Sequence, residues 1–286
     1  MFEARIENVK NDILTLTGNE TEYQVMSITG LNPPKAQINN STVTGLDGAK
    51  YNSSRLEVRN IVITLKINGD VETNRQNLYK YCPTKEWCKF YYKNNNRNVY
   101  IEGYVENVEC DLFTDSEIAQ ISLICEQPYF KAMNEIIDDI SKVISLFEFP
   151  FTINYEEPIP FSEIQLDKIT NIYNNSESET GVIIVINFIN NVNKIEIRNT
   201  VTGEYFILNY VFLEDDKISI NTNKGEKSIK LLRNGITYNL FTAIQKGSTF
   251  FRLSIGDNLF SYEADDGSSD TSVDIVFKHR NIYRGV

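Results

Sequence analysis

Apolar and polar residues alternate along most of the chain, and this period of two predicts strands rather than helices. Short alternating runs such as DILTLTG and YQVMSITG each close on a glycine, as hairpin strands do. A longer run over residues 55–67, RLEVRNIVITLKI, is partly apolar on both faces. We expect one long strand there, covered on both sides or shared with a partner.

One segment of the first half follows a helical pattern instead. In NGDVETNRQNLYKYCP, Asp70 or Thr73 can cap a helix whose apolar face includes Leu78, and Pro83 ends it. The runs EWCKFYYK, VYIEGYVENVECDLF and AQISLICEQPYF then return to the strand pattern. The first half is therefore predicted to be an all-β unit with one helix, of sandwich or barrel-like form.

A second helical pattern lies between the halves, in PYFKAMNEIIDDISKVISLFEFPF. Its isoleucines and valine recur at helical spacing with acidic residues between them. We expect a short helix or an extended linker that packs across both halves and fixes one against the other. Pro150, Pro158 and Pro160 then force an extended path.

A long polar stretch, LNPPKAQINNSTVTGLDGAKYNSS, separates residues 30 and 55. Loops of this length inside a compact domain are usually functional or disordered, so an arm reaching a neighbouring subunit is one interpretation.

The second half consists of short strands separated by hairpin turns such as Asn234-Gly235 and Lys224-Gly225. This spacing predicts a jelly-roll β-sandwich. The mainly β chain is thus divided into a domain over residues 1–130, a linker or helix over 131–160, and a sandwich over 161–286.

Composition narrows the function. The chain of 286 residues has a net charge of −11 and a pI near 4.8, with the acidic excess in both halves, so nucleic acid is an unexpected partner. Charges interrupt every apolar run near the start, so neither a signal peptide nor a membrane anchor is predicted. The cysteines form no C-x-x-C pair and are expected to be free, buried thiols; they are Cys82, Cys88, Cys110 and Cys125.

Candidate catalytic and metal-binding groups are few, and no cofactor is expected. His279 is the only histidine, and Lys278 and Arg280 beside it suggest a solvated position. The loop at residues 264–270, ADDGSSD, lacks the spacing of a calcium loop. Glycoside hydrolysis needs two carboxylates that face one cleft, but neighbouring residues of a strand point to opposite faces. Catalysis is therefore not expected from the four acidic pairs, which are Asp138-Asp139, Glu156-Glu157, Asp215-Asp216 and Asp265-Asp266.

Carbohydrate binding through aromatic side chains of the second half is the main rival to a structural role. The single tryptophan, Trp87, lies in the other half, and the aromatic residues of the second half alternate as core residues do. We expect them in the core: Tyr205, Phe206, Tyr210, Phe250, Phe251 and Tyr262.

In order along the chain, SSRLEVRNIVITLKINGD, NRQNLYKY, IEGYVENVE and ISLICEQPYF resemble the distal tail protein family of long-tailed bacteriophages, prophages and phage-tail-like particles. KISINTNKGEKSIKL, LSIGDNLFSYEA and the closing YRGV are similar to the galectin-like sandwich of that family.

The resemblance implies a non-enzymatic virion component, assembled in the bacterial host cytoplasm, that forms a hexameric ring. As a baseplate or tail-tip hub it would join the tail tube protein to the tip or tail-associated lysin protein. The sandwich would meet a receptor-binding or peripheral baseplate protein and serve host attachment.

A ring of identical subunits needs a heterologous interface, in which one surface of a subunit meets a different surface of the next. We expect the arm and the strand after it to supply part of this interface, through Pro33, Pro34, Asn39, Asn40, Tyr51, Arg55 and Arg59. Three hypotheses remain open: a tail hub, a carbohydrate-binding adhesion module acting through the sandwich, and a glycan-cleaving enzyme.

Overall fold

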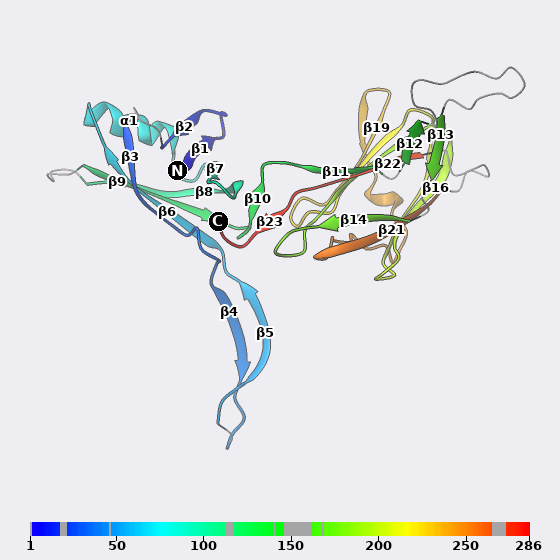
Figure 1. The fold of residues 1–286 in the computed structure, drawn as a ribbon, viewed down its shortest axis with the longest axis horizontal. Helices are drawn as coiled ribbons and strands as arrows, with labels where there is room; N and C mark the ends of the chain where they lie inside the picture. Colours follow the sequence, from blue (N-terminus) through cyan, green and yellow to red (C-terminus); the bar gives the residue numbers. More distant parts are fainter. Residues whose placement is uncertain are drawn as a thin grey trace, which may run out of the picture. The chain divides into compact units, whose positions relative to one another are not determined.

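The chain folds into two compact units. The computed structural model describes residues 2–17, 22–45, 47–111, 117–139, 141–145, 162–166, 169–264 and 273–286. Unit 1 comprises Met1–Met133 together with Ile282–Val286, and unit 2 comprises Asn134–Asn281. The chain therefore leaves unit 1, builds unit 2, and returns (Figure 1).

Unit 1 is built on a nine-stranded, mostly antiparallel sheet with the order β2-β1-β7-β8-β9-β6-β3; β10 and β23 join it beside β8. The strands are β1 (Glu3–Asn8), β2 (Ile13–Thr15), β3 (Tyr23–Thr29), β6 (Arg59–Ile67), β7 (Trp87–Lys93), β8 (Asn98–Cys110), β9 (Ile118–Cys125), β10 (Phe130–Ala132) and β23 (Ile282–Tyr283). The sheet runs open from β2 to β3, and no closed barrel forms within the described residues.

The alternating pattern of β6 suits its place inside the sheet, between β9 and β3. Ile61, Ile63 and Leu65 are fully buried on one face, while Val62 and Thr64 on the other face are half-buried. The single strand expected over 55–67 is wrong in one respect, because the chain leaves the strand conformation at residues 57–58. The part before this break belongs to the arm and the part after it to the sheet.

The predicted helix is present as α1 (Val71–Tyr81), the one α-helix in the described part of the chain. The Asp70 carboxylate accepts a hydrogen bond from the Thr73 amide at 3.3 Å, which caps the N-terminus. Leu78 is fully buried in the core under the sheet. The helix ends at Cys82, whose amide bonds to the Leu78 carbonyl, and Pro83 follows.

Unit 2 is a β-sandwich, as predicted, and its two sheets share one core. Phe260 from one sheet and Phe277 from the other have ring centroids 5.0 Å apart. The six-stranded sheet has the order β11-β22-β15-β18-β19-β20, and the four-stranded sheet β14-β21-β16-β17. The strands are β11 (Ile136–Asp139), β14 (Thr170–Asn174), β15 (Ile183–Phe188), β16 (Val192–Asn199), β17 (Tyr205–Phe212), β18 (Lys217–Asn221), β19 (Ser228–Arg233), β20 (Ile236–Asn239), β21 (Gly256–Ala264) and β22 (Val273–His279); a 3₁₀ turn, η1, spans Phe241–Ala243.

The helix expected between the halves is wrong where the structure describes the segment. Residues 136–139 form β11, which pairs with β22 at the edge of the six-stranded sheet. β12 (Ser141–Ser145) pairs with β13 (Ser162–Leu166). Partner strands supply the backbone hydrogen bonds here, so the helical spacing of the apolar residues does not decide the conformation. Residues 140 and 146–161, which carry the rest of the expected linker, lie outside the described residues.

A buried ion pair ties the turn after β17 to strand β19. Asp216 is 2% exposed and accepts hydrogen bonds from the Leu213 amide at 2.8 Å and from Arg233 Nε at 2.8 Å. Arg233 also donates to the Val211 carbonyl. Burial alone would raise the pKa of Asp216, but the hydrogen bonds from Arg233 and Leu213 outweigh it and hold the pKa below its ordinary value.

We expect Asp216→Asn to lower the free energy of unfolding of unit 2 by roughly 2 to 4 kcal/mol at pH 7, because it leaves the Arg233 charge without its partner. The contribution of Asp216 is present above its unfolded pKa of about 3.9 and is lost as the pH falls through the lower folded pKa. Hydrogen exchange of the β18 and β19 amides measures both effects. The exposed neighbour Asp215 supplies the control Asp215→Asn; equal losses in the two variants would contradict the assignment.

Candidate functional site

The polar stretch expected to form an arm is an isolated β-hairpin of unit 1. β4 (Ala36–Ser41) pairs antiparallel with β5 (Lys50–Leu56), and the two form a sheet of their own. Every residue of β4, and every residue of β5 except Leu56, is exposed. In Figure 1 the hairpin projects from the end of the large sheet of unit 1. A two-stranded hairpin alone in water is marginally stable, so this arm is expected to gain from a partner surface.

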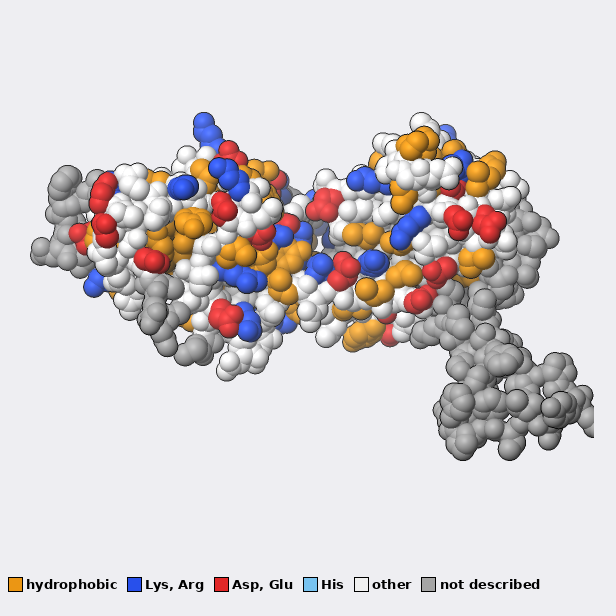
Figure 2. Space-filling model, turned by 90° about the horizontal axis from the view of Figure 1, so that it is seen from above, with side chains coloured by type: hydrophobic (Ala, Val, Ile, Leu, Met, Phe, Trp, Pro, Cys, Tyr) orange, Lys and Arg blue, Asp and Glu red, His pale blue; other side chains and the backbone are white. Residues whose placement is uncertain are grey.

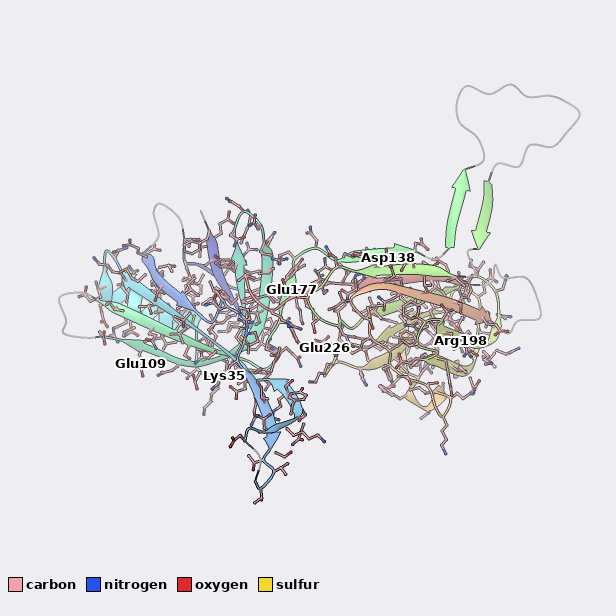
Figure 3. All side chains as sticks on the ribbon, turned by 60° about the horizontal axis from the view of Figure 1, so that its bottom comes forward. Lys35, Glu109, Asp138, Glu177, Arg198 and Glu226 are labelled. Atoms are coloured by element: carbon pink, nitrogen blue, oxygen red, sulfur yellow. The ribbon has the colours of Figure 1, made fainter. Side chains whose placement is uncertain are left out.

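The two faces of the arm differ. On one face Gln37 binds Arg55 at 2.8 Å, and Asn39 binds Ser53 at 3.0 Å, so polar groups satisfy one another across the strands. On the other face lie Ile38 and, across a β-bulge, Tyr51; these side chains are 58% and 59% exposed. Figure 3 shows side chains leaving both faces of the hairpin, with Lys35 at its root. The arm is thus amphipathic, with its apolar face uncovered in this chain.

Charge also distinguishes the arm from the rest of the chain. Between residues 35 and 56 there are three basic residues and one acidic residue, whereas the chain as a whole carries −11. On the face seen in Figure 2, acidic and basic side chains are interspersed over each unit. A mildly basic arm on an acidic protein is electrostatically complementary to another copy of the same chain.

Six of the seven residues expected at an interface lie on the arm or its root. Asn39 and Asn40 are on β4, Tyr51 and Arg55 are on β5, and all four are exposed. Pro33 and Pro34 lie in the segment that leads to β4; Pro33 is exposed and Pro34 is half-buried.

Arg59 is placed differently from the prediction. It is 3% exposed, its guanidinium lies 4.6 Å from the centre of the Phe130 ring, and it donates to backbone carbonyls of its own unit. Burial lowers the pKa of Arg59, although an arginine keeps its charge in proteins. The side chain of Arg59 therefore supports the root of the arm from inside and offers nothing to a neighbour.

The hydrophobic pattern of the sequence does not indicate that the root of the arm requires a glycine at position 30. Gly30 has a φ of +83°, and a Cβ there would lie 2.1 Å from the Asn60 carbonyl oxygen. Only glycine fits such a close approach. The glycine at the end of YQVMSITG was a signal for a turn, but its contact with the neighbouring strand could not be read from the sequence.

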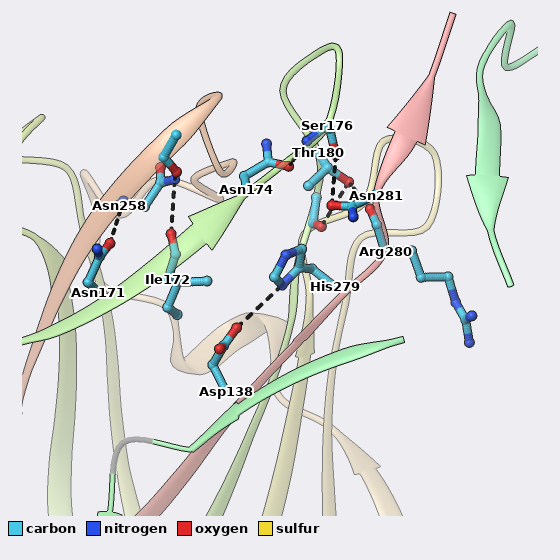
Figure 4. A network of polar contacts seen from close by, with 12 residues as sticks. Asp138, Asn171, Ile172, Asn174, Ser176, Thr180, Asn258, His279, Arg280 and Asn281 are labelled. Carbon is cyan, nitrogen blue, oxygen red and sulfur yellow. Dashed lines mark hydrogen bonds and ion pairs between the residues drawn. The ribbon is translucent and has the colours of Figure 1, made fainter. Parts of the chain in front are cut away.

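His279 is buried, so the expected solvated position is wrong. In a strand, successive side chains point to opposite faces, and His279 points inward although Lys278 and Arg280 flank it. Its Nδ1 lies 3.7 Å from Asp138 Oδ2 on β11, too long for a hydrogen bond (Figure 4). Neither of these atoms, nor Nε2, has a hydrogen-bond partner among the described residues.

The remaining chemical candidates are accounted for as follows. Asp216 serves the ion pair with Arg233, and two of the acidic pairs, Glu156-Glu157 and Asp265-Asp266, lie outside the described residues, as does the loop at 265–270. Within the described residues no group of three or more potential ligands could hold a metal ion. No disulfide joins the cysteines: Cys82, Cys88 and Cys125 are buried and Cys110 is half-buried. No helix in that part of the chain is long and apolar enough to cross a membrane.

Five of the six aromatic residues assigned to the core do pack there. Phe206 and Phe251 are buried, and three more pack against the same core: Tyr210, Phe250 and Tyr262. Tyr205 is half-buried, with the Arg198 guanidinium 5.6 Å from its ring. Most of the aromatic residues that could have formed a carbohydrate-binding surface therefore pack in the core of unit 2.

Burial lowers the pKa of His279, and the Asp138 carboxylate offsets this only in part. Because the unfolded chain binds the proton more readily, the stability of the β11 edge should fall as the pH drops below about 6.5. We expect hydrogen exchange of the β11 amides, corrected for the intrinsic rate, to be faster at pH 5.5 than at pH 7.5. His279→Leu should remove this dependence, and an unchanged pH slope in that variant would contradict the assignment.

Similarity to known proteins extends over both units. Residues 175–280 match the family model described as the siphovirus-type tail component, C-terminal domain. No curated protein matches the chain.

Among solved structures, the chain is similar to the Dit protein of phage SPP1, with a TM-score of 0.68 at 13% identity over 97% of this chain and 98% of that one. It is also similar to chains of the phage p2 baseplate in its activated conformation with Ca and with Sr, with TM-scores of 0.55 and 0.56 at 12% and 13% identity, each over 98% of both chains.

The resemblance to the distal tail protein family is thus confirmed. The family model covers most of unit 2, and the structural similarity extends the fold over both units. Over residues 175–280 the chain therefore has the domain of a siphovirus-type tail component, and over both units it has the fold of the similar phage structures.

Proposed function

We propose that this chain is a baseplate hub subunit that assembles with five identical copies into a closed ring. The ring would join the tail tube protein to the tail-tip or tail-associated lysin protein. Unit 2 would face a receptor-binding or peripheral baseplate protein. The role is structural rather than enzymatic, and assembly would take place in the cytoplasm of the bacterial host.

One observation carries the proposal: the arm buries almost nothing in its own chain. Ile38, Val43 and Tyr51 are each more than half exposed on a hairpin that has no other element packed on it. A neighbouring subunit that covers the apolar face would remove these side chains from water, at about 25 cal/mol for each Å² buried.

The arm also suits the symmetry of a ring. In a closed ring each subunit uses two different surfaces, one to give and one to receive. A projecting hairpin with a basic excess can be the giving surface, and the acidic body of the next copy the receiving one. One similar structure is that of a hub of an adsorption apparatus and another that of a baseplate, which agrees with this role.

Native mass spectrometry and negative-stain electron microscopy of the full chain test the ring, for which we expect six subunit masses. Deleting residues 37–51 should abolish it. Replacing both Ile38 and Tyr51 with serine should weaken assembly at least tenfold, since buried aromatic and aliphatic anchors contribute most of the affinity of an interface.

Val201 and Ile255 supply the matched control, because they are 66% and 60% exposed on unit 2. Their double replacement with serine removes similar apolar surface and should leave the ring intact. Intact rings after deletion of residues 37–51 would overturn the role of the arm. A monomer that binds immobilised glycans through unit 2 would instead favour the carbohydrate-binding alternative.

A further inference from the structure

The segment Ile282–Val286, here called the return segment, belongs to unit 1 although it follows all of unit 2 in the sequence. Its strand β23 pairs with β10, with Phe130 opposite Tyr283. The Arg97 guanidinium lies 3.7 Å from the centre of the Tyr283 ring, and the Val286 amide donates to the Leu31 carbonyl at 3.1 Å. Unit 1 is thus completed only by residues more than 140 positions beyond its main part.

The return segment meets the root of the arm at Arg59. This guanidinium donates to the Pro128 carbonyl at 2.8 Å, to the Asn32 carbonyl at 2.7 Å, and to the carbonyls of Gly30 and Arg284. Three segments distant in sequence therefore share one buried cation. Charge-assisted hydrogen bonds are about twice as strong as neutral ones, and a buried arginine that loses an acceptor is left with an unsatisfied donor.

The backbone of the return segment also presses against the first residues of the arm. A Cβ built on Gly285 would lie 3.0 Å from Pro33 Cδ and 3.2 Å from the Leu31 carbonyl oxygen. On the other side of the root, the Glu57 amide donates to the Lys35 carbonyl at 3.0 Å. This bond extends the ladder of the hairpin by one pair, so the contacts that hold residues 30–33 also bear on the direction of the arm.

We propose that the return segment is an assembly element: by docking on Arg59 and on residues 31–33, it sets the direction of the arm and makes the subunit competent to form the ring. This inference rests on the proposed function. A hairpin that swings about its root reaches the neighbouring subunit in many orientations and loses conformational freedom on binding, which lowers the affinity. Because the return segment comes after unit 2, ring formation would wait until unit 2 has been made.

The decisive variant is Gly285→Val, in the full chain. The new side chain has no room against Pro33 and Leu31, so the return segment should lift from the root while the core is unchanged. We expect hydrogen exchange of the Val286 and Glu57 amides, which donate to the Leu31 and Lys35 carbonyls, to rise at least tenfold and the fraction of chains in rings to fall at least tenfold. Fluorescence of Trp87, on β7 of unit 1, reports whether the core stays folded.

Two further variants of the chain serve as controls for this experiment. Val201→Ser, on the exposed surface of unit 2, leaves the return segment unchanged and should assemble as the unaltered chain does. A chain ending at Asn281 removes the return segment altogether and should behave like Gly285→Val or be more severely impaired.

Each result has a definite meaning. Rings from Gly285→Val with faster exchange at the root would overturn the inference, as would lost rings with unchanged exchange and rings from the chain that ends at Asn281. If the unaltered chain forms no ring, the proposed function fails and the assembly role fails with it. The two failures are distinguishable, because exchange at the root in Gly285→Val is measured on the monomer as well.

Discussion

A single buried cation organises the root of the arm in unit 1. Arg59 has no carboxylate among its hydrogen-bond partners and is held by carbonyl groups and the face of Phe130. A charge removed from water in this way is costly unless its donors are satisfied, so the segments that supply the carbonyls must all be in place. The orientation of the arm thus depends on two other segments, the return segment and the segment between β9 and β10 that contains Pro128.

The arm and the two cores reflect different physical requirements. Each core is closed: isoleucine and phenylalanine side chains fill it, and the Asp216–Arg233 pair joins two parts of the sandwich. The arm is open, because its strands pair only with each other and its apolar side chains face water. This division gives unit 1 a stable body with one exposed, amphipathic surface.

Unit 1 is completed by residues that follow unit 2 in the chain. Unit 2 is inserted between the main part of unit 1 and its last strand, β23. An insertion of this kind makes completion of unit 1 depend on contacts of large sequence separation, which form late because loop closure must precede them.

The sequence by itself determined the local structure. Alternating residues identified most strands, Asp70 and Pro83 bracketed the helix, and the polar stretch before Arg55 identified the arm, because these features depend on neighbours within a few positions. Only the tertiary structure decided that residues 136–139 pair as an edge strand, that His279 points inward, and that Arg59 is buried. The bond between Arg59 and the Arg284 carbonyl joins residues 225 positions apart. No periodicity encodes such a contact, because it is fixed by which strands meet and by what space the packed core leaves between them.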